Sequence, residues 1–543
     1  MRKTFLVLVA VAIAITAAPA LAELQNITVG GEIRIRGNYT NNVFESPNNL
    51  GAAGAFPGFL PVETRWPAGN VNWLPARPIG NFILAPGNNA AGILSPYRWD
   101  DKGESISFVE QRTRLNVQAD FSDNVMAYIE LDSYDIWGED FRSNYITGAD
   151  FITQTSDDVE IFQAYIEADE MWDLPLRLRV GRQELSFGSE WLVGDGTKGP
   201  LFYGLSFDAI RLTYCPMDTL TIDAWWAKLA ENFQAEEDGD VNFYGIYASY
   251  TGLENIVLDA YWLLVRDARS LNDTNFIWPV EWIEDAIGVD DYNVTNLHTI
   301  GLRGAGTVGA LDFEAEVAYQ MGNAGQQGFA FKPFLYGDDD AEFEAWGANL
   351  MVGYSLDMVW NPRIWVRGAY FGGEDNRDIS FWEWLSPFDM PEASVSFNRL
   401  FSDVIYSGYV DLNCDFSNGY LATLGIDVNP TESLMATLCV THFWADETFD
   451  SPRYFTLGKY RIPIAPALSF WTDSSDDSLG TEIALFLTYH YTEDLMFQLG
   501  LTYFLADDGV GDGNYVANNG LIFNGGSDDD DGIYLYLETC LKF

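Results

Sequence analysis

The chain has 543 residues with 80 acidic and 29 basic side chains, so its formal net charge of −51 excludes nucleic-acid binding, which requires a basic face. Hydrophobic residues make up 48% and aromatic residues 15%, yet the mean hydropathy is −0.06. After residue 22, no apolar run approaches the roughly 20 residues that a transmembrane helix needs. The protein is therefore either soluble or crosses a membrane as strands.

The first 22 residues have the pattern of an export signal. Arg2 and Lys3 precede an apolar stretch that ends in "ALA" at residues 20–22, which fits a charged region, a hydrophobic region and a small-residue cleavage site. The alternative is a retained membrane anchor, but the apolar stretch is short for one. We expect residues 1–22 to be a signal peptide and residues 23–543 to form the exported barrel domain described next.

The predicted elements that follow are strands, because apolar and polar residues alternate with a period of two. In "ALDFEAEVAYQ", Leu311, Phe313 and Val317 share one face, while Asp312 and Glu316 share the other. The same alternation occurs, in chain order, in "GGEIRIRGNY", "RIWVRGAY", "TEIALFLTYHY", "DLMFQLGLTYF" and the final "GIYLYLETCLKF". A soluble sandwich would need two large apolar faces to meet, so these long strands favour a sheet between lipid and water.

About eighteen such segments follow one another, and the connections between them alternate between short and long. Short ones include "SDN" at Ser122 and "TED" at Thr492, whereas residues 41–103 and the segments around Ile146 and Trp384 are long. This alternation is typical of the periplasmic turns and extracellular loops of outer-membrane barrels, and lipid leaves no partner for an open sheet edge. We predict an all-β fold, a closed antiparallel transmembrane β-barrel of about 18 strands, with both termini on the periplasmic side.

No pattern in the sequence predicts a resident metal or a cofactor. The cysteines are far apart and form no C-x-x-C motif. A Cys414–Cys439 disulfide and free thiols at Cys215, Cys414, Cys439 and Cys540 both stay open. The acidic, Gly-rich runs near Glu236, Asp339 and Asp529 fit solvated loops, with divalent-cation binding, or bridging to lipopolysaccharide phosphates, as the alternative.

Three segments carry a family resemblance. These are "GRQELSFGSEWLVG" at 181–194 followed by "SFDAIRLTY", then "FNRLFSDVIYSGYVDL" at 397–412, and "GTEIALFLTYHYTEDLMFQLGLTYFLADDGVGDG" at 480–513. In this order they resemble the alginate export porin family. The resemblance implies a bacterial outer-membrane barrel of about eighteen strands, whose polar lumen passes an anionic polysaccharide or smaller solutes. It also implies lumenal arginines that attract uronate carboxylates.

Strand parity supplies candidates for these arginines, since they lie opposite the apolar positions. The candidate pore-lining residues are Arg34, Arg36, Arg112, Arg114, Arg177, Arg179, Arg211, Arg303, Arg363 and Arg367. The same face carries Glu32, Glu110, Asp120, Glu130, Asp132, Glu167, Asp223, Asp259, Asp312, Glu314, Glu316 and Glu482, of which Glu130 and Glu314 are further pore candidates. The arginines either select carboxylate-bearing solutes or are simply neutralised by these acids.

Arg182 departs from the parity rule. It shares the outward parity of Leu178 and Val180, where an arginine at the bilayer midplane costs about 2–4 kcal/mol. Gly181 beside it suggests a bulge that turns Arg182 inward. With such a bulge, Arg182 would join Gln183 and Glu184 in a polar cluster near the constriction, where a ligand-binding role and a purely structural salt bridge both stay open.

These features together predict a passive channel for polysaccharides or small hydrophilic solutes, including anionic sugars, in contact with outer-membrane lipid and lipopolysaccharide. The acidic loops would repel a polyanion, so a neutral sugar, a small solute or a cation is an equal alternative. An enzyme is not expected, because the three histidines His298, His442 and His490 accompany no H-E-x-x-H or G-x-S-x-G motif. Aromatic loop segments such as "FWEWLSPF" and "NFIWPVEWIED" leave an adhesion or sheath role open. The oligomeric state is not predicted.

Overall fold

The structure is a computed structural model that describes residues 24–41, 105–121, 124–137, 159–196, 202, 204–231, 240–268, 294–324, 342–373, 396–410, 416–448, 476–510 and 531–543, together with short segments at 98–99, 394–395, 451–452, 454–457, 460–463, 472–473, 511–512, 515–517 and 522–526. The predicted signal peptide lies outside these residues. Within them, no helix combines the length and the apolar character needed to span a bilayer.

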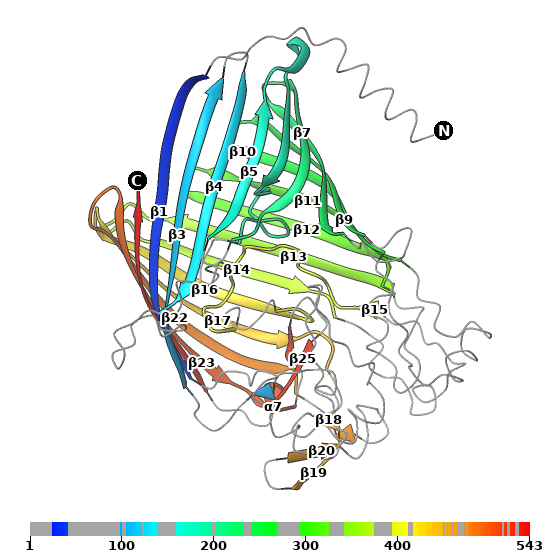
Figure 1. The fold of residues 1–543 in the computed structure, drawn as a ribbon. Helices are drawn as coiled ribbons and strands as arrows, with labels where there is room; N and C mark the ends of the chain where they lie inside the picture. Colours follow the sequence, from blue (N-terminus) through cyan, green and yellow to red (C-terminus); the bar gives the residue numbers. More distant parts are fainter. Residues whose placement is uncertain are drawn as a thin grey trace, which may run out of the picture.

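Eighteen of the 19 strands of the main sheet hydrogen-bond in a closed ring (Figure 1). In ring order they are β1 (Leu24–Asn41), β3 (Ser105–Phe121), β4 (Val125–Ile136), β5 (Glu160–Ala168), β6 (Leu176–Gln183), β7 (Phe207–Met217), β8 (Leu220–Ala230), β9 (Val241–Leu253), β10 (Ile256–Asp267), β11 (Thr295–Val308), β12 (Leu311–Asn323), β13 (Glu342–Ser355), β14 (Arg363–Phe371), β16 (Gly419–Thr431), β17 (Leu434–Ala445), β22 (Ser478–His490), β23 (Leu495–Ala506) and β26 (Gly532–Lys542). The ring closes because β1 pairs with β26 as well as with β3, in a register that runs from Glu32↔Lys542 to Asn41↔Ile533. All ring neighbours are antiparallel, which confirms the predicted fold and strand number.

The remaining described elements lie outside this ring. They are β15 (Ser394–Val395), which pairs in parallel with β13, the short strands β2 (Arg98–Trp99), β18 (Ser451–Pro452), β19 (Tyr454–Leu457), β20 (Tyr460–Pro463), β21 (Thr472–Asp473), β24 (Tyr515–Ala517) and β25 (Ile522–Gly526), and the helical turns η2 (Met171–Asp173) and α7 (Asp508–Asp512).

The two ends of the barrel differ in the length of their connections. At one end the connections run from two residues, such as 218–219 between β7 and β8, to seven, such as 356–362 between β13 and β14. Tight turns here use left-handed backbone at Asn255 (φ 57°) and Gly309 (φ 65°), a conformation that asparagine and glycine tolerate best. The first residue of β1, Leu24, and the last residues of β26 also lie at this end.

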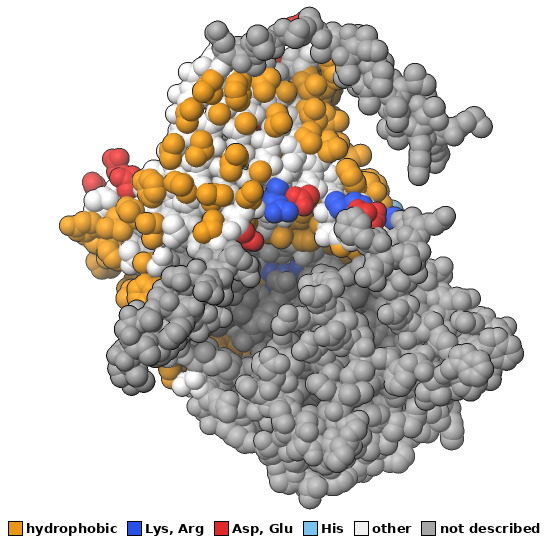
Figure 2. All heavy atoms as spheres, viewed as in Figure 1, with side chains coloured by type: hydrophobic (Ala, Val, Ile, Leu, Met, Phe, Trp, Pro, Cys, Tyr) orange, Lys and Arg blue, Asp and Glu red, His pale blue; other side chains and the backbone are white. Residues whose placement is uncertain are grey.

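The outward face of the barrel is apolar and carries aromatic side chains near both ends. Leu302 (60% exposed) and Leu424 (58%) are examples of this apolar face, and Figure 2 shows hydrophobic side chains spread over the outer wall of the barrel. Tyr354 and Trp360 lie near the short turns, and Trp346 lies near the long loops. An apolar band flanked by aromatic residues is the surface that a strand barrel presents to a bilayer.

Three of the four cysteines lie within the described residues. Cys215, Cys439 and Cys540 are free thiols in the structure. Cys414 lies outside the described residues, as do the acidic runs near Glu236, Asp339 and Asp529 and the aromatic loop segments at 275–285 and 381–388.

Candidate functional site

Two long loops fold back into the barrel and join each other inside it. We call residues 184–196, 202 and 204–206 the first inward loop and residues 396–410 the second inward loop. Gly194 N donates to Phe401 O at 2.8 Å, and Phe401 N donates to Leu192 O at 3.0 Å. Because each loop satisfies backbone groups of the other, the pair forms one structural unit in the lumen.

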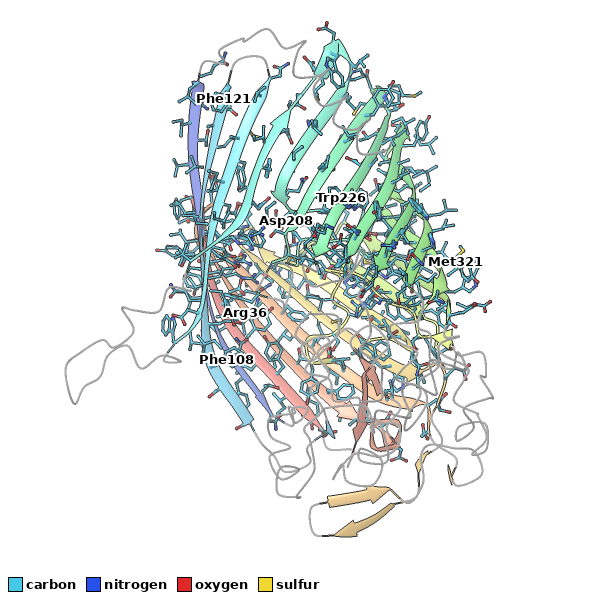
Figure 3. The ribbon with its side chains drawn as sticks, turned by 45° about the vertical axis from the view of Figure 1, so that its right-hand side comes forward. Arg36, Phe108, Phe121, Asp208, Trp226 and Met321 are labelled. Carbon is cyan, nitrogen blue, oxygen red and sulfur yellow. The ribbon has the colours of Figure 1, made fainter. Side chains whose placement is uncertain are left out.

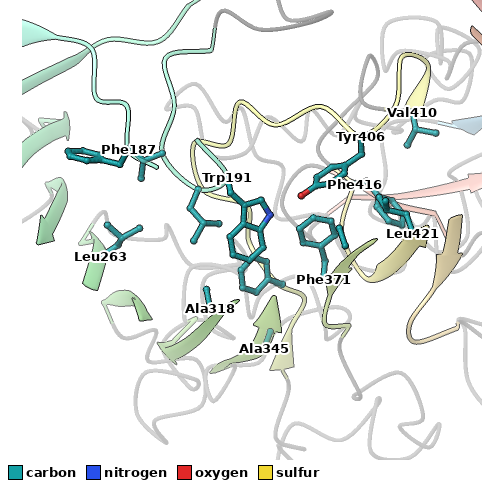
Figure 4. Packing of buried hydrophobic residues seen from close by; sticks show 14 of the residues in the cluster. Phe187, Trp191, Leu263, Ala318, Ala345, Phe371, Tyr406, Val410, Phe416 and Leu421 are labelled. Atoms are coloured by element: carbon teal, nitrogen blue, oxygen red, sulfur yellow. The ribbon is translucent and has the colours of Figure 1, made fainter. Parts of the chain in front are cut away.

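The junction of the two loops contains the large apolar cluster of the molecule (Figure 4). Trp191 of the first loop is fully buried and stacks on Phe397 of the second loop, with ring centroids 5.7 Å apart. Phe371 of β14 lies 6.4 Å from Trp191 and meets Phe416 edge to face. A barrel of this strand number otherwise encloses an aqueous channel, so these aromatic rings occupy space that would hold water.

The barrel wall holds the first inward loop from opposite sides. Arg112 of β3 donates from Nη1 to Phe202 O at 2.8 Å, and Ser189 Oγ donates to Glu316 of β12 at 3.0 Å. β3 and β12 are nine strands apart in the ring of eighteen. The loop therefore crosses the lumen from one wall to the other.

A buried carboxylate on β22 accepts several hydrogen bonds from the second inward loop. Glu482 is 2% exposed and accepts hydrogen bonds from the Ser407 hydroxyl, from Gly408 N at 2.9 Å and from Tyr409 N at 3.1 Å. Tyr406 adds a bond to Asn349 of β13 at 3.1 Å. Three donors converging on one carboxylate fix the position of this loop relative to the wall.

A buried group of arginines lies where the first inward loop meets β1 and β3. The guanidinium carbons of Arg34, Arg36 and Arg112 lie 4.7, 5.0 and 5.7 Å from the centre of the Phe202 ring. Arg36 has no exposed surface, and Figure 3 shows it inside the barrel. The ion pairs are Arg34–Glu538 at 2.7 Å, Arg36–Glu538 at 2.6 Å and Arg112–Glu32 at 2.6 Å. These arginines thus stabilise the loop as well as lining the wall.

Arg114 connects the wall to the start of the first inward loop. It lies 3.0 Å from Asp132, 3.4 Å from Glu130 and 3.5 Å from Glu184. Burial raises the pKa of the Glu184 carboxyl to about 7; the nearby Asp195 charge adds to the rise and Arg114 opposes it. Glu184 therefore changes its charge near neutral pH.

Most of the other predicted arginines face the lumen in ion pairs between neighbouring strands. The pairs are Arg177–Asp169 at 2.5 Å, Arg179–Glu167 at 2.6 Å, Arg211–Asp223 at 2.8 Å, Arg303–Asp259 at 2.7 Å, Arg303–Glu314 at 3.1 Å, Arg363–Asp312 at 2.5 Å and Arg363–Asp427 at 2.9 Å. The neighbours Asp427 and Glu538 were not among the predicted carboxylates. Strand parity could have found both, since each lies two residues from another inward position.

Arg367 of β14 differs from these pairs. Its Nη1 donates to Ile405 O at 3.3 Å and its Nη2 to Met351 Sδ at 3.5 Å, and no carboxylate among the described residues pairs with it. Arg399 of the second inward loop, 1% exposed, is a buried arginine that the sequence reasoning missed. It lies in a loop, where strand parity gives no signal.

Arg182 is not in the lumen, contrary to the prediction. β5 and β6 pair without a register shift at Gly181, so Arg182 keeps the outward parity of Val180. It lies 2.9 Å from Asp208 at the long-loop end of β7, and both side chains are about half exposed, at 44% and 56%. Figure 2 shows acidic and basic side chains gathered at this edge of the apolar band. The ion pair thus lies at the rim, where water and lipid headgroups remove the cost of a midplane charge.

One group of acidic side chains has a geometry that could hold a metal ion. Glu190 and Asp195 of the first inward loop and Asp403 of the second have carboxylate oxygens within 4.8 Å of one another. The loop junction brings them together, so sequence spacing gave no sign of the group. Oxygen ligands of this kind suit calcium or magnesium.

Comparisons with known proteins show which family the chain matches. The family model described as Alginate export matches residues 100–522. Solved structures with a similar fold include Pseudomonas aeruginosa OccK5 (OpdH), at 11% identity over 95% of this chain and 98% of that chain with a TM-score of 0.45. Acinetobacter baumannii OccAB3 matches at 9% identity over 95% of this chain and 99% of that chain, with a TM-score of 0.45. An anion-selective porin from Comamonas acidovorans matches at 9% identity over 95% of this chain and 99% of that chain, with a TM-score of 0.38. No curated protein matches the chain. Because the family model covers most of the chain, the protein belongs to the Alginate export family and is a porin-like channel of the bacterial outer membrane, not an enzyme.

Proposed function

We propose that the protein is a passive diffusion channel for small hydrophilic solutes, with the two inward loops as its narrowest point. The observation that carries this proposal is that the first inward loop is bonded to β3 and to β12, on opposite walls. The second loop is bonded to Glu482 and packs against the first. A rigid crossing of this kind limits the size of what passes, which favours small solutes over a polysaccharide chain.

The charges of the wall bear on the choice of cargo. Ten inward arginines face the twelve predicted carboxylates together with Asp427 and Glu538. Nine of the ten form ion pairs with these acids or with Asp169, as described above, so their positive charge is largely compensated. We therefore propose that most lumenal arginines position loops and balance acids, and that the wall does not offer a continuous basic path for a polyuronate.

Three further features belong to the same proposal. Residues 1–22 direct export and are removed. The barrel contacts outer-membrane lipid and lipopolysaccharide through its apolar band. No cofactor takes part, because solute movement through a water-filled lumen needs none; divalent cations at the acidic loops would act only on the surface charge.

The deciding measurement is conductance of the refolded mature protein in a planar bilayer, with reversal potential under a salt gradient. We expect stable single-channel conductance, partial block by neutral oligosaccharides and no current carried or blocked by alginate. Strong anion preference with block by alginate would instead assign a polyuronate cargo. Complete absence of conductance, with sugar binding retained, would favour the adhesion or sheath role.

A further inference from the structure

The inner wall near the short-turn end carries a patch of polar side chains of which only Asp120 is charged. We propose that this patch, which we call the entrance patch, is a binding subsite for an uncharged sugar at the periplasmic entrance of the channel. This inference rests on the proposed channel function and names a solute class for it. The entrance patch consists of Asn26 and Thr28 of β1, Gln118 and Asp120 of β3, Tyr128 of β4 and Tyr165 of β5.

Strand pairing brings these side chains together on the lumen side. The main row of the patch crosses four neighbouring strands through the Cα pairs Thr28↔Gln118, Gln118↔Tyr128 and Tyr128↔Tyr165. Four strands about 4.8 Å apart span roughly 14 Å, which is the size of a small saccharide. The row shares the inward parity of Arg114, since Gln118 follows Arg114 by four residues on β3.

The entrance patch lies between the first inward loop and the short turns. Glu184 N, at the start of that loop, donates at 3.2 Å to Gln163 Oε1, and Gln163 is the next inward position of β5 before Tyr165. At the other edge of the patch, Asp120 precedes Phe121, the last residue of β3, which Figure 3 labels at the short-turn end. The short turns of such barrels are periplasmic, so a solute that enters from the periplasm meets the patch before it meets the loops.

The polar groups of the patch are accessible and keep hydrogen-bonding capacity. Asn26 and Thr28 are exposed, and the other four side chains are half-buried. Asn26 Nδ2 makes only long contacts, 3.3 Å to Thr28 Oγ1 and 3.4 Å to Asp120 Oδ2. The Tyr165 hydroxyl has no hydrogen-bond partner among the described residues. A solute in the lumen can therefore reach donors and acceptors that the wall does not fully engage.

The charge of the patch indicates which sugars it accepts. Asp120 accepts from Gln118 Nε2 at 2.8 Å and has no cationic partner among the described residues. Glu167, which borders the patch on β5, is by contrast paired with Arg179 at 2.6 Å. An ionised carboxylate only accepts hydrogen bonds, so Asp120 suits the hydroxyl donors of a sugar, whereas its negative charge disfavours a uronate.

Two stacked tyrosines form the apolar part of the patch. The ring centroids of Tyr128 and Tyr165 lie 5.2 Å apart with 24° between the ring planes. The Arg179 guanidinium lies 4.4 Å from the centre of the Tyr165 ring, and the Tyr128 hydroxyl donates to Glu130 at 2.6 Å. These contacts fix both rings in the wall. Amide, hydroxyl and carboxylate groups beside fixed aromatic rings complement an uncharged sugar, which is apolar on its ring faces and polar at its edge.

The first test measures block of single-channel current by maltohexaose, an uncharged sugar chain, added to one side of oriented channels at a time. We expect stronger block from the periplasmic side, because the inward loops separate the patch from the other side. Gln118→Ala should weaken this block about fivefold, which corresponds to the loss of about one hydrogen bond. Gln498→Ala is the matched control and should leave the block unchanged, since Gln498 has the same inward parity near the short-turn end of β23 but bonds to Thr488 outside the patch.

The second test concerns the charge of the solute. Glucose, glucuronate and glucosamine share one ring and are uncharged, anionic and cationic. We expect glucose to block the wild-type channel more strongly than glucuronate, and Asp120→Asn to reduce that difference, because the variant removes the repulsion. Block by glucosamine without block by glucose, lost in Asp120→Asn, would instead assign a cation site to Asp120.

Several results would overturn the assignment. They are equal maltohexaose block from both sides, unchanged block in Gln118→Ala, an equal loss in Gln498→Ala, or stronger block by glucuronate than by glucose. Tyr165→Phe removes only a hydroxyl, so it guards against a folding defect and should still weaken the block. If the wild-type protein does not conduct, the proposed function fails. Maltohexaose binding to the detergent-solubilised protein, measured by calorimetry with the same variants, would then still test the entrance patch.

Discussion

The lumenal arginines in ion pairs depend on acids that neighbouring strands supply. Parity places Arg34 and Arg303 in the lumen, but only the strand register brings Glu538 and Asp259 within 2.7 Å of them. An arginine at the rim has different surroundings, since Arg182 faces outward and pairs with Asp208. The effect of a charged side chain therefore depends on its depth in the membrane and on the nearest acid, and not on residue type alone.

For the rim ion pair we expect a small effect on stability. Arg182→Gln should lower the free energy of unfolding by about 1 kcal/mol or less, because half-exposed ion pairs contribute little. The variant should leave the ion preference unchanged, since the side chain does not reach the lumen. Urea unfolding in liposomes and reversal potentials measure the two quantities, and a marked change in selectivity would contradict the outward placement.

Glu184 provides a pH-dependent charge at the start of the first inward loop. Its pKa is raised to about 7, so the folded protein holds this proton more tightly than the unfolded chain does. Ionisation of Glu184 as the pH rises from about 4.5 through 7 therefore disfavours the folded loop, and the effect is complete above pH 7. We expect the channel to become more cation-preferring between pH 6 and pH 8, and Glu184→Gln to remove that shift. An identical shift in the variant would assign it to other acids.

At the level of elements, the second inward loop is bonded to the wall through Glu482 of β22 as well as through Asn349 and Gln320. Glu482 accepts three hydrogen bonds from the second loop, and its loss removes all three, at about 1–3 kcal/mol for each buried donor that stays unsatisfied. Glu482→Ala should therefore loosen the loop, raise the single-channel conductance and increase current noise. Gln498→Ala on the neighbouring strand β23 is the control, because its side chain bonds only to Thr488. Equal conductance in both variants would show that Glu482 does not restrain the loop.

At the scale of the whole molecule, closure of β26 onto β1 fixes both termini at the short-turn end. An epitope tag at the C-terminus should be inaccessible to antibody in intact cells and accessible after permeabilisation. A tag inserted in the connection of residues 137–159 should be accessible in intact cells. The opposite pattern would reverse the orientation of the barrel in the membrane.

The sequence by itself determined the barrel. Alternation with a period of two and the contrast between short and long connections predict the strands, their number and the side on which the termini lie, because these depend on local pattern and on the need to pair every backbone group in lipid. Parity likewise places ten of the eleven predicted arginines on the inner face, and it gives Arg182 the outward position that the structure shows, since the expected bulge at Gly181 is absent from the β5–β6 register.

The tertiary structure alone decided the site. The junction of the first and second inward loops, the three acids at that junction and the hydrogen bonds around Glu482 join residues far apart in the chain. No local pattern carries such pairings, because each depends on how a loop folds back and on which strand lies across the ring. The lumen charge of this channel is therefore a property of the closed barrel, whereas the lipid-facing surface is already present in each strand.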